Sequence, residues 1–222
     1  MKCAVLFSGG KDSCYSTYLA KQKGYEIKCL ISVFSKNKES YMFHIPCISQ
    51  TKKQARVMKI PLLIQKTKGK KETELKDLKK AISKAKEKFR IQAIVTGAIK
   101  SNYQAKRIKK ICKDLNLKCF NPLWHKDEFE YLNELIKSRF EIIIVGVSAY
   151  PLDNSWLGKK INDDFIDEIK KLHEKYKIHP AGEGGELETF VLNCPLFKKG
   201  LKIASKKIFG EKNSWVMEVK LK

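Results

Sequence analysis

The sequence lacks several features that would assign it to a familiar class. Its seven cysteines are irregularly spaced and form no CxxC pair, so we expect reduced thiols, mostly in the core, with Cys112 and Cys119 among them, and no zinc or iron–sulfur site. No apolar run approaches the roughly 18 residues of a transmembrane helix, and the N-terminal segment has no cleavage site typical of a signal peptide. We therefore expect a globular cytoplasmic protein that does not enter a membrane.

Arginine is scarce although the chain is strongly basic. Only four of the 46 Lys and Arg residues are Arg, and with 24 acidic residues the formal net charge is +22. Proteins that read nucleic-acid bases favour the bidentate fork of Arg, so the composition argues against a nucleic-acid partner. Residues 52–90 carry half of this net positive charge, with 13 Lys and two Arg against four acidic residues. This pattern is typical of a solvated helix face, and the alternative is a docking surface for an acidic partner.

Short apolar runs alternate with amphipathic segments through the first half of the 222-residue chain. We predict strands at 3–7, 27–34, 62–64, 91–96 and 117–120, separated by helices at 13–23, 50–58, 72–89 and 103–115. This alternation predicts an α/β fold, with a Rossmann-like parallel sheet covered by helices on both faces.

Pro122 marks a predicted break between two domains, at 1–122 and 123–222. The second part has predicted helices at 128–138 and 163–176, a strand at 142–148, a glycine- and glutamate-rich loop at 181–189 and a β-hairpin at 202–221. We expect a smaller C-terminal α/β domain.

The segment SGGKDS, at residues 8–13, joins the first predicted strand to the first helix. Free backbone N–H groups at the positive end of a helix suit phosphate, and glycine lets the backbone approach the anion closely. Lys11 adds a positive charge, the hydroxyls of Ser8 and Ser13 can donate to phosphate oxygens, and Asp12 can hold Mg²⁺ together with a nucleotide. The segment is neither a Walker A loop nor a GxGxxG fingerprint.

Two further segments concentrate polar residues. GAIKSNYQ, at residues 97–104, follows a predicted strand at the edge where open α/β sheets bind ligands. EGGELET, at residues 183–189, places Glu183, Glu186 and Glu188 in one loop. Because close carboxylates repel one another unless a cation neutralises them, we expect this loop to hold a positively charged ligand.

SGGKDS resembles the pyrophosphate loop of the N-type ATP pyrophosphatases, which have an adenine nucleotide alpha hydrolase-like fold. Combined with a GAI-S-YQ-R segment that ends at Arg107 and with EGGE-x-E-T, it makes the chain similar to the diphthine–ammonia ligases, in order from Met1 to about Phe197. The chain departs from the family pattern EGGE(F/Y)ET at Leu187, which stands at the aromatic position.

The resemblance implies ATP-dependent amidation of diphthine on translation elongation factor 2. The carboxylate of diphthine would be adenylated with release of pyrophosphate, and ammonia would then displace AMP. ATP and Mg²⁺ are the implied cofactors, the metal being held by Asp12, and ammonium and the elongation factor are the implied partners. Since no ammonia-generating domain is evident, free ammonium is the expected nitrogen source.

The resemblance also implies site residues. The implied catalytic residues are Lys11, Asp12, Glu183 and Glu186. The implied ATP-binding residues are Ser8, Gly9, Gly10, Lys11, Asp12, Ser13 and Gly97. The candidate substrate-binding residues are Ser101, Tyr103, Gln104, Arg107, Glu183, Gly184, Gly185, Glu186, Glu188 and Thr189. His44 is added because it follows the second predicted strand, and the alternative is an ordinary surface or core histidine.

Two other functions remain open. The Lys surplus favours a tRNA-modifying ATP pyrophosphatase that makes lysidine or a thiolated base, whereas the absence of CxxC, the scarcity of Arg and the EGGE-x-E-T segment argue against it. A non-catalytic adenine-nucleotide sensor needs the phosphate loop but not the acidic loop. A homo-oligomer is compatible with the sequence.

Overall fold

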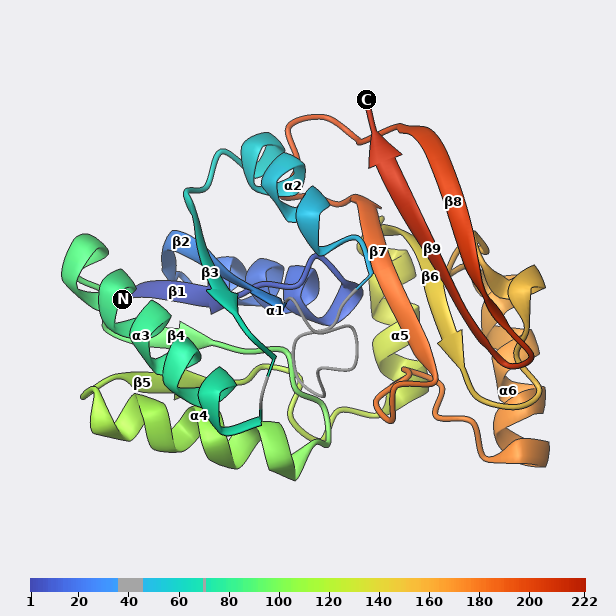
Figure 1. The fold of residues 1–222 in the computed structure, drawn as a ribbon, viewed down its shortest axis with the longest axis horizontal. Helices are drawn as coiled ribbons and strands as arrows, with labels where there is room; N and C mark the ends of the chain where they lie inside the picture. The colour runs from blue at the N-terminus through green and yellow to red at the C-terminus, as the bar shows by residue number, and fades with distance from the viewer. Residues whose placement is uncertain (36–45, 70) are drawn as a thin grey trace.

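The computed structural model describes residues 1–35, 46–69 and 71–222, which form two sheets with helices packed around them (Figure 1). The first sheet is parallel throughout, in the order β3-β2-β1-β4-β5. Its strands are β1 (Lys2–Leu6), β2 (Glu26–Ser35), β3 (Leu62–Thr67), β4 (Ala93–Val95) and β5 (Lys118–Phe120). This topology confirms the predicted Rossmann-like α/β fold.

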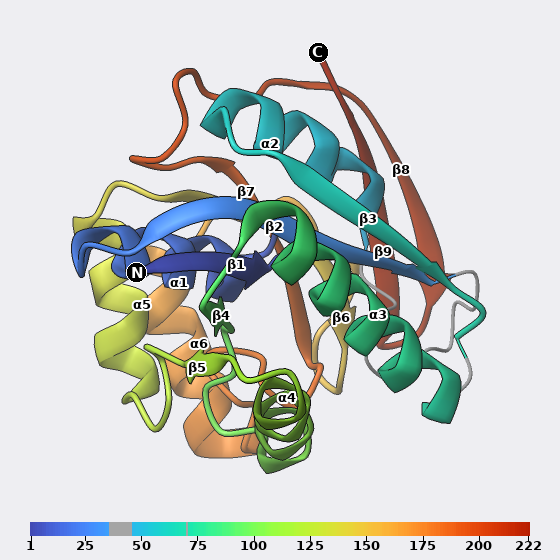
Figure 2. The ribbon, with the colours of Figure 1, turned by 90° about the vertical axis from the view of Figure 1, so that its left-hand side faces the viewer.

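Helices cover both faces of the parallel sheet (Figure 2). One face is covered by α3 (Lys71–Phe89) and α4 (Asn102–Asp114), which bury Ile82 and Ile108 against Ile31 and Ile94 of the strands. The other face is covered by α1 (Lys11–Gln22) and α2 (Thr51–Met58), the latter following the short 3₁₀ helix η1 (Ile48–Gln50). Apolar side chains therefore line both surfaces of these strands, as their continuous hydrophobic sequences require.

The second sheet is antiparallel, in the order β7-β6-β9-β8. Its strands are β6 (Glu141–Ser148), β7 (Leu187–Asn193), β8 (Ile203–Glu211) and β9 (Ser214–Leu221), and its helices are α5 (Glu128–Lys137), η2 (Asn154–Trp156) and α6 (Asp163–Tyr176). The predicted β8–β9 hairpin is confirmed. The prediction of a loop through residue 189 is wrong, because residues 187–189 pair with β6 as the start of β7.

One hydrophobic core joins the two sheets. It runs from Val5 of β1 through α1 and α5 to Phe190 of β7. At its centre the Tyr15 ring lies 5.6 Å from the Tyr131 ring and 5.4 Å from the Phe140 ring, measured between centroids. The predicted break at 122 falls in the connection between β5 and α5. The two sheets thus form one packed unit.

The surface of α3 agrees with the solvated-face interpretation of residues 52–90. Lys76, Lys79, Lys80 and Lys84 are exposed, and Lys79 pairs with Asp114 at 2.7 Å. The expectation that Cys119 lies in the core is wrong, since this residue of β5 is exposed, whereas Cys112 is buried. None of the helices in the described ranges has the length and apolar character needed to cross a bilayer.

Candidate active site

A cavity of about 520 Å³ opens at the carboxyl edge of the parallel strands, between the two sheets. Three segments that are far apart in the sequence form its walls: residues 8 and 10–13, the turn at 96–98 after β4, and residues 182–185 with the first residues of β7. Its volume lies within the roughly 300–1,000 Å³ of small-molecule sites, and its position matches the ligand edge of open α/β sheets. It is therefore the candidate active site.

The segment at residues 8–13, named the phosphate loop after its predicted role, is folded around the hydroxyl of Ser13. This oxygen accepts hydrogen bonds from the backbone N–H groups of Ser8 and Gly9, both at 3.2 Å, and donates to the Gly10 carbonyl at 3.1 Å. Helix α1 begins at Lys11, directly after this turn, so its positive end faces the cavity. Ser13 thus shapes the loop. The sequence predicted only that its hydroxyl contacts phosphate, and did not indicate this role.

The glycines of the loop allow close approach of protein segments. Gly9 has φ +84°, and a Cβ there would lie 2.3 Å from Oε1 of Gln54. A Cβ on Gly10 would lie 3.1 Å from the Thr189 carbonyl oxygen, and one on Gly97 would lie 2.8 Å from the backbone carbon of Asp12. Glycine is required here because β7, α2 and the turn after β4 pack tightly against the loop. Our interpretation assigned these glycines to phosphate contact alone and did not include this packing.

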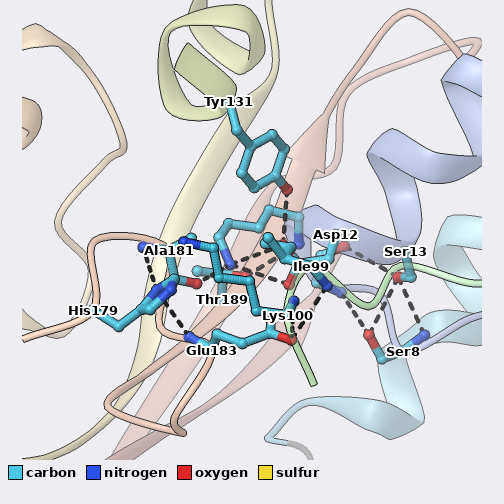
Figure 3. A network of polar contacts seen from close by, with 12 residues as sticks. Ser8, Asp12, Ser13, Ile99, Lys100, Tyr131, His179, Ala181, Glu183 and Thr189 are labelled. Carbon is cyan, nitrogen blue, oxygen red and sulfur yellow. Dashed lines mark hydrogen bonds and ion pairs between the residues drawn. The ribbon is translucent and has the colours of Figure 1, made fainter. Parts of the chain in front are cut away.

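Lys11, Asp12 and Tyr131 form a polar cluster in which Lys11 and Tyr131 are buried and Asp12 is partly exposed to the cavity (Figure 3). Lys11 is only 3% exposed, and its Nζ donates to the Ala181 carbonyl at 2.6 Å and pairs with Asp12 Oδ1 at 3.0 Å. The hydroxyl of Tyr131 donates to the same Asp12 oxygen at 2.8 Å. Burial, reinforced by Asp12, raises the pKa of Tyr131 well above its ordinary value, so this hydroxyl remains a donor.

Strand β7 is attached to the phosphate loop by its backbone and side chains. The backbone N–H of Lys11 donates to Thr189 Oγ1 at 3.1 Å, and the N–H of Val191 donates to the Gly9 carbonyl at 3.0 Å. Gln54 of α2, fully buried, donates from Nε2 to the carbonyls of Gly9 and Val191 at 2.9 and 2.8 Å. These hydrogen bonds hold the loop between α2 and β7.

The three carboxylates of the acidic segment have different surroundings. One oxygen of Glu183 accepts hydrogen bonds from three consecutive N–H groups, those of Ile99, Lys100 and Ser101, at 3.2, 3.0 and 2.8 Å (Figure 3). Glu186 does not line the cavity, and its oxygens accept from the N–H groups of residues 179 and 184 within its own loop. Glu183 and Glu186 therefore hold backbone in place, while Glu188 faces the cavity.

Glu188 lies on β7 beside the Lys11–Asp12 pair. Burial raises the pKa of Glu188 to about 7, an effect that Lys11 opposes and Asp12 reinforces. This carboxyl group is therefore balanced between its charged and neutral forms near neutral pH.

The remaining predicted residues divide between the cavity and its surroundings. Ser101, the N-cap of α4, lines the cavity together with Gln104. Tyr103 and Arg107 do not line the cavity. The Arg107 guanidinium stacks on the Tyr103 ring, 3.4 Å from its centroid. His44 lies outside the described residues. The predicted residues that line the cavity are Ser8, Gly10, Lys11, Asp12, Ser13, Gly97, Ser101, Gln104, Glu183, Gly184, Gly185, Glu188 and Thr189.

Sequence reasoning missed three polar residues of the site. Tyr131 contacts Asp12, Gln54 fixes the loop, and Ser148 at the end of β6 lines the cavity. Tyr131 resembles an ordinary core position on an amphipathic helix, and Gln54 lies in a Lys-rich helix, so neither had a local signal. In the part of the chain that the structure describes, no three His, Cys, Asp or Glu side chains cluster to hold a metal ion.

Comparison with known proteins places the chain in a family. A solved structure from Methanocaldococcus jannaschii, described as a predicted subunit of tRNA methyltransferase, superposes with a TM-score of 0.47 at 17% identity, covering 90% of this chain and 99% of that one. The diphthine–ammonia ligase of Bos taurus is 35% identical over 94% of this chain and 85% of its own length, and that of Rattus norvegicus is 37% identical over 90% and 81%. Residues 1–119 match the diphthamide synthase N-terminal domain and residues 127–221 the C-terminal domain. The chain therefore belongs to the diphthamide synthase family, whose relatives here are named as C–N ligases.

Proposed function

We propose that the protein amidates diphthine on translation elongation factor 2, using ATP and ammonia. The observation that carries this proposal is the shared cavity, which both the SGGKDS loop and the EGGELET segment line, with the backbone N–H of Lys11 bonded to Thr189 Oγ1 between them. Family membership supports the reaction class, since the relatives are named diphthine–ammonia ligases.

The proposed chemistry has two steps. An oxygen of the diphthine carboxylate attacks the α-phosphorus of ATP, and the bond from that phosphorus to the β-phosphate bridging oxygen breaks, so that pyrophosphate leaves. Ammonia then attacks the acyl carbon of the adenylate, the carbon–oxygen bond to AMP breaks, and nitrogen loses a proton to give the amide. Positioning and charge stabilisation account for most catalysis of phosphoryl transfer.

The residues of the loop suit the first step. The N-terminus of α1 presents positive charge to the cavity, where the leaving pyrophosphate would gain negative charge, and Lys11 lines the same cavity. Glu183 holds the turn 99–101 and Glu186 holds the loop 179–186, so we assign both to ordering the site rather than to direct catalysis.

Mg²⁺ would accompany the nucleotide. Asp12 lines the cavity and its side chain is 33% exposed, which suits a metal that needs one or two carboxylates and completes its shell with phosphates and water. The ion would neutralise charge on the transferring phosphates.

Pyrophosphate release by the full-length protein tests the proposal. We expect release of pyrophosphate and AMP with amide formation when ATP, ammonium and diphthine-bearing elongation factor are all supplied, and no amide when any one of them is omitted. Turnover on tRNA instead would assign the protein to tRNA modification. ATP binding without turnover on either substrate would assign it to nucleotide sensing.

A further inference from the structure

Glu188 differs from the other two carboxylates of its segment because it accepts no hydrogen bond from the described residues. Glu183 binds three backbone N–H groups and Glu186 binds two. Glu188 instead reaches the cavity from β7, one residue before Thr189, which binds the phosphate loop. A carboxylate in this position is open to a ligand that donates hydrogen bonds or carries positive charge.

The strand geometry directs Glu188 toward the phosphate loop. It pairs in register with Gly146 of β6, next to a β-bulge between Ile144 and Gly146, and bulges re-aim neighbouring side chains. A Cβ on Gly146 would lie 3.0 Å from the Glu188 Cβ, so glycine gives the glutamate stem its space.

The charged groups that face Glu188 are Lys11 and Asp12, and both already have partners. Lys11 Nζ binds the Ala181 carbonyl and the Asp12 carboxylate, and Asp12 also accepts from Tyr131. Lys11 therefore does not form a direct ion pair with Glu188 among the described contacts. A small cation that can donate several hydrogen bonds, such as ammonium, therefore matches this open carboxylate.

We propose, on the basis of the proposed function, that Glu188 binds the ammonium ion that the ligase consumes and removes its proton. The ammonium N–H bond breaks, its proton passes to the Glu188 carboxylate, and the freed electron pair of nitrogen forms the new bond to the acyl carbon. The carbon–oxygen bond to AMP then breaks with its electron pair leaving on AMP, and the second nitrogen proton passes to water.

The protonation behaviour of Glu188 fits this role. A pKa near 7 leaves the group partly ionised at neutral pH, where a general base works best, because it can both accept and release a proton. The closeness of Glu188 to the phosphate loop also places the nucleophile on the side of the cavity where adenylation takes place.

Glu188→Gln separates the ammonium step from adenylation. The variant has the same shape but lacks the base, so we expect ATP–pyrophosphate exchange with diphthine-bearing elongation factor to stay within about twofold of wild type. Turnover with ammonium at pH 7 should fall about 100-fold or more. Hydroxylamine is uncharged at neutral pH and needs no deprotonation before attack, so hydroxamate formation should stay within about fivefold.

Matched variants separate this effect from charge loss and from misfolding. Glu218→Gln removes a carboxylate from an exposed position on β9 of the same sheet and should leave all three readouts unchanged. Glu188→Asp keeps the base on a shorter stem, and we expect it to retain more ammonium turnover than Glu188→Gln.

Four outcomes would overturn the inference. Unchanged ammonium turnover in Glu188→Gln would remove the need for a base. If Glu188→Gln lost ATP–pyrophosphate exchange to the same extent as ammonium turnover, Glu188 would be assigned to metal or phosphate binding. If Glu188→Gln lost hydroxamate formation to the same extent as ammonium turnover, and its KM for the elongation factor were raised, Glu188 would be assigned to binding the quaternary ammonium of diphthine. Absence of exchange and of amide in the wild-type protein would reject the proposed function itself, and the inference with it.

Discussion

The three hydrogen bonds to Glu183 predict a local loosening of the site when this carboxylate is removed. In Glu183→Ala the N–H groups of Ile99, Lys100 and Ser101 lose a common acceptor at 3.2, 3.0 and 2.8 Å. A hydrogen bond to a charged group contributes about 1.5–3 kcal/mol, and three donors that share one half-buried oxygen do not add in full. We therefore expect the turn to lose about 2–4 kcal/mol of protection.

Hydrogen–deuterium exchange measures this loss at the three amides. Since every 1.4 kcal/mol is about tenfold, exchange at residues 99–101 should accelerate about 30- to 1,000-fold, provided that these amides exchange by local opening. Glu183→Gln keeps an acceptor oxygen but not the charge, and should fall between wild type and Glu183→Ala. Glu211→Ala, at an exposed position on β8, serves as the control. Unchanged exchange at residues 99–101 in Glu183→Ala would refute the reasoning that Glu183 holds this turn in place.

Three further expectations concern the same cavity. Tyr131→Phe removes the 2.8 Å hydrogen bond to Asp12 and should lower the free energy of unfolding by about 1.5–3 kcal/mol in urea titrations, and a change below about 0.5 kcal/mol would contradict it. The pKa of Glu188 is raised from 4.5 to about 7 in the folded protein, so between these pH values the folded state binds more protons than the unfolded state. The contribution of Glu188 to the free energy of unfolding therefore falls as pH rises from about 4.5 to 7. Glu188→Gln should therefore be more stable than wild type at pH 8, by on the order of 2–3 kcal/mol, with the difference shrinking toward pH 4.5; an equal stability difference at both pH values would exclude this linkage. Gly97→Ala places a Cβ 2.8 Å from the backbone of Asp12 and should cost about 1–3 kcal/mol of stability and weaken ATP binding in calorimetry, whereas wild-type affinity would show that the turn moves freely.

Local sequence patterns predicted the parallel sheet and the phosphate loop because both depend on short segments. The apolar run before SGGKDS and the helix after it place the loop at the carboxyl end of β1, and the structure agrees. The same reasoning failed at residues 187–189, where acidic and small residues resemble a loop. Pairing with β6, which is about 40 residues away in the sequence, makes them a strand.

The roles of the three glutamates could not be predicted from the sequence because they depend on tertiary contacts. Spacing alone treats Glu183, Glu186 and Glu188 as one acidic cluster. The fold separates them, since Glu183 meets the start of α4, Glu186 turns back on its own loop, and Glu188 follows the pleat of β7 into the cavity. Tyr131 became part of the site for a similar reason, because packing of α5 against α1 brings its hydroxyl to Asp12.

The bonds between β7 and the phosphate loop have a thermodynamic consequence. Thr189 and Val191 hold Lys11 and Gly9, while Glu188 of the same strand faces the cavity. A ligand that shifts β7 therefore shifts the nucleotide loop as well. If nucleotide strengthens binding of the second substrate by some factor, that substrate must strengthen nucleotide binding by the same factor, since the coupling free energy is reciprocal. Under the proposed function, the attachment of one strand to one loop would make the binding of ATP and of its acceptor interdependent.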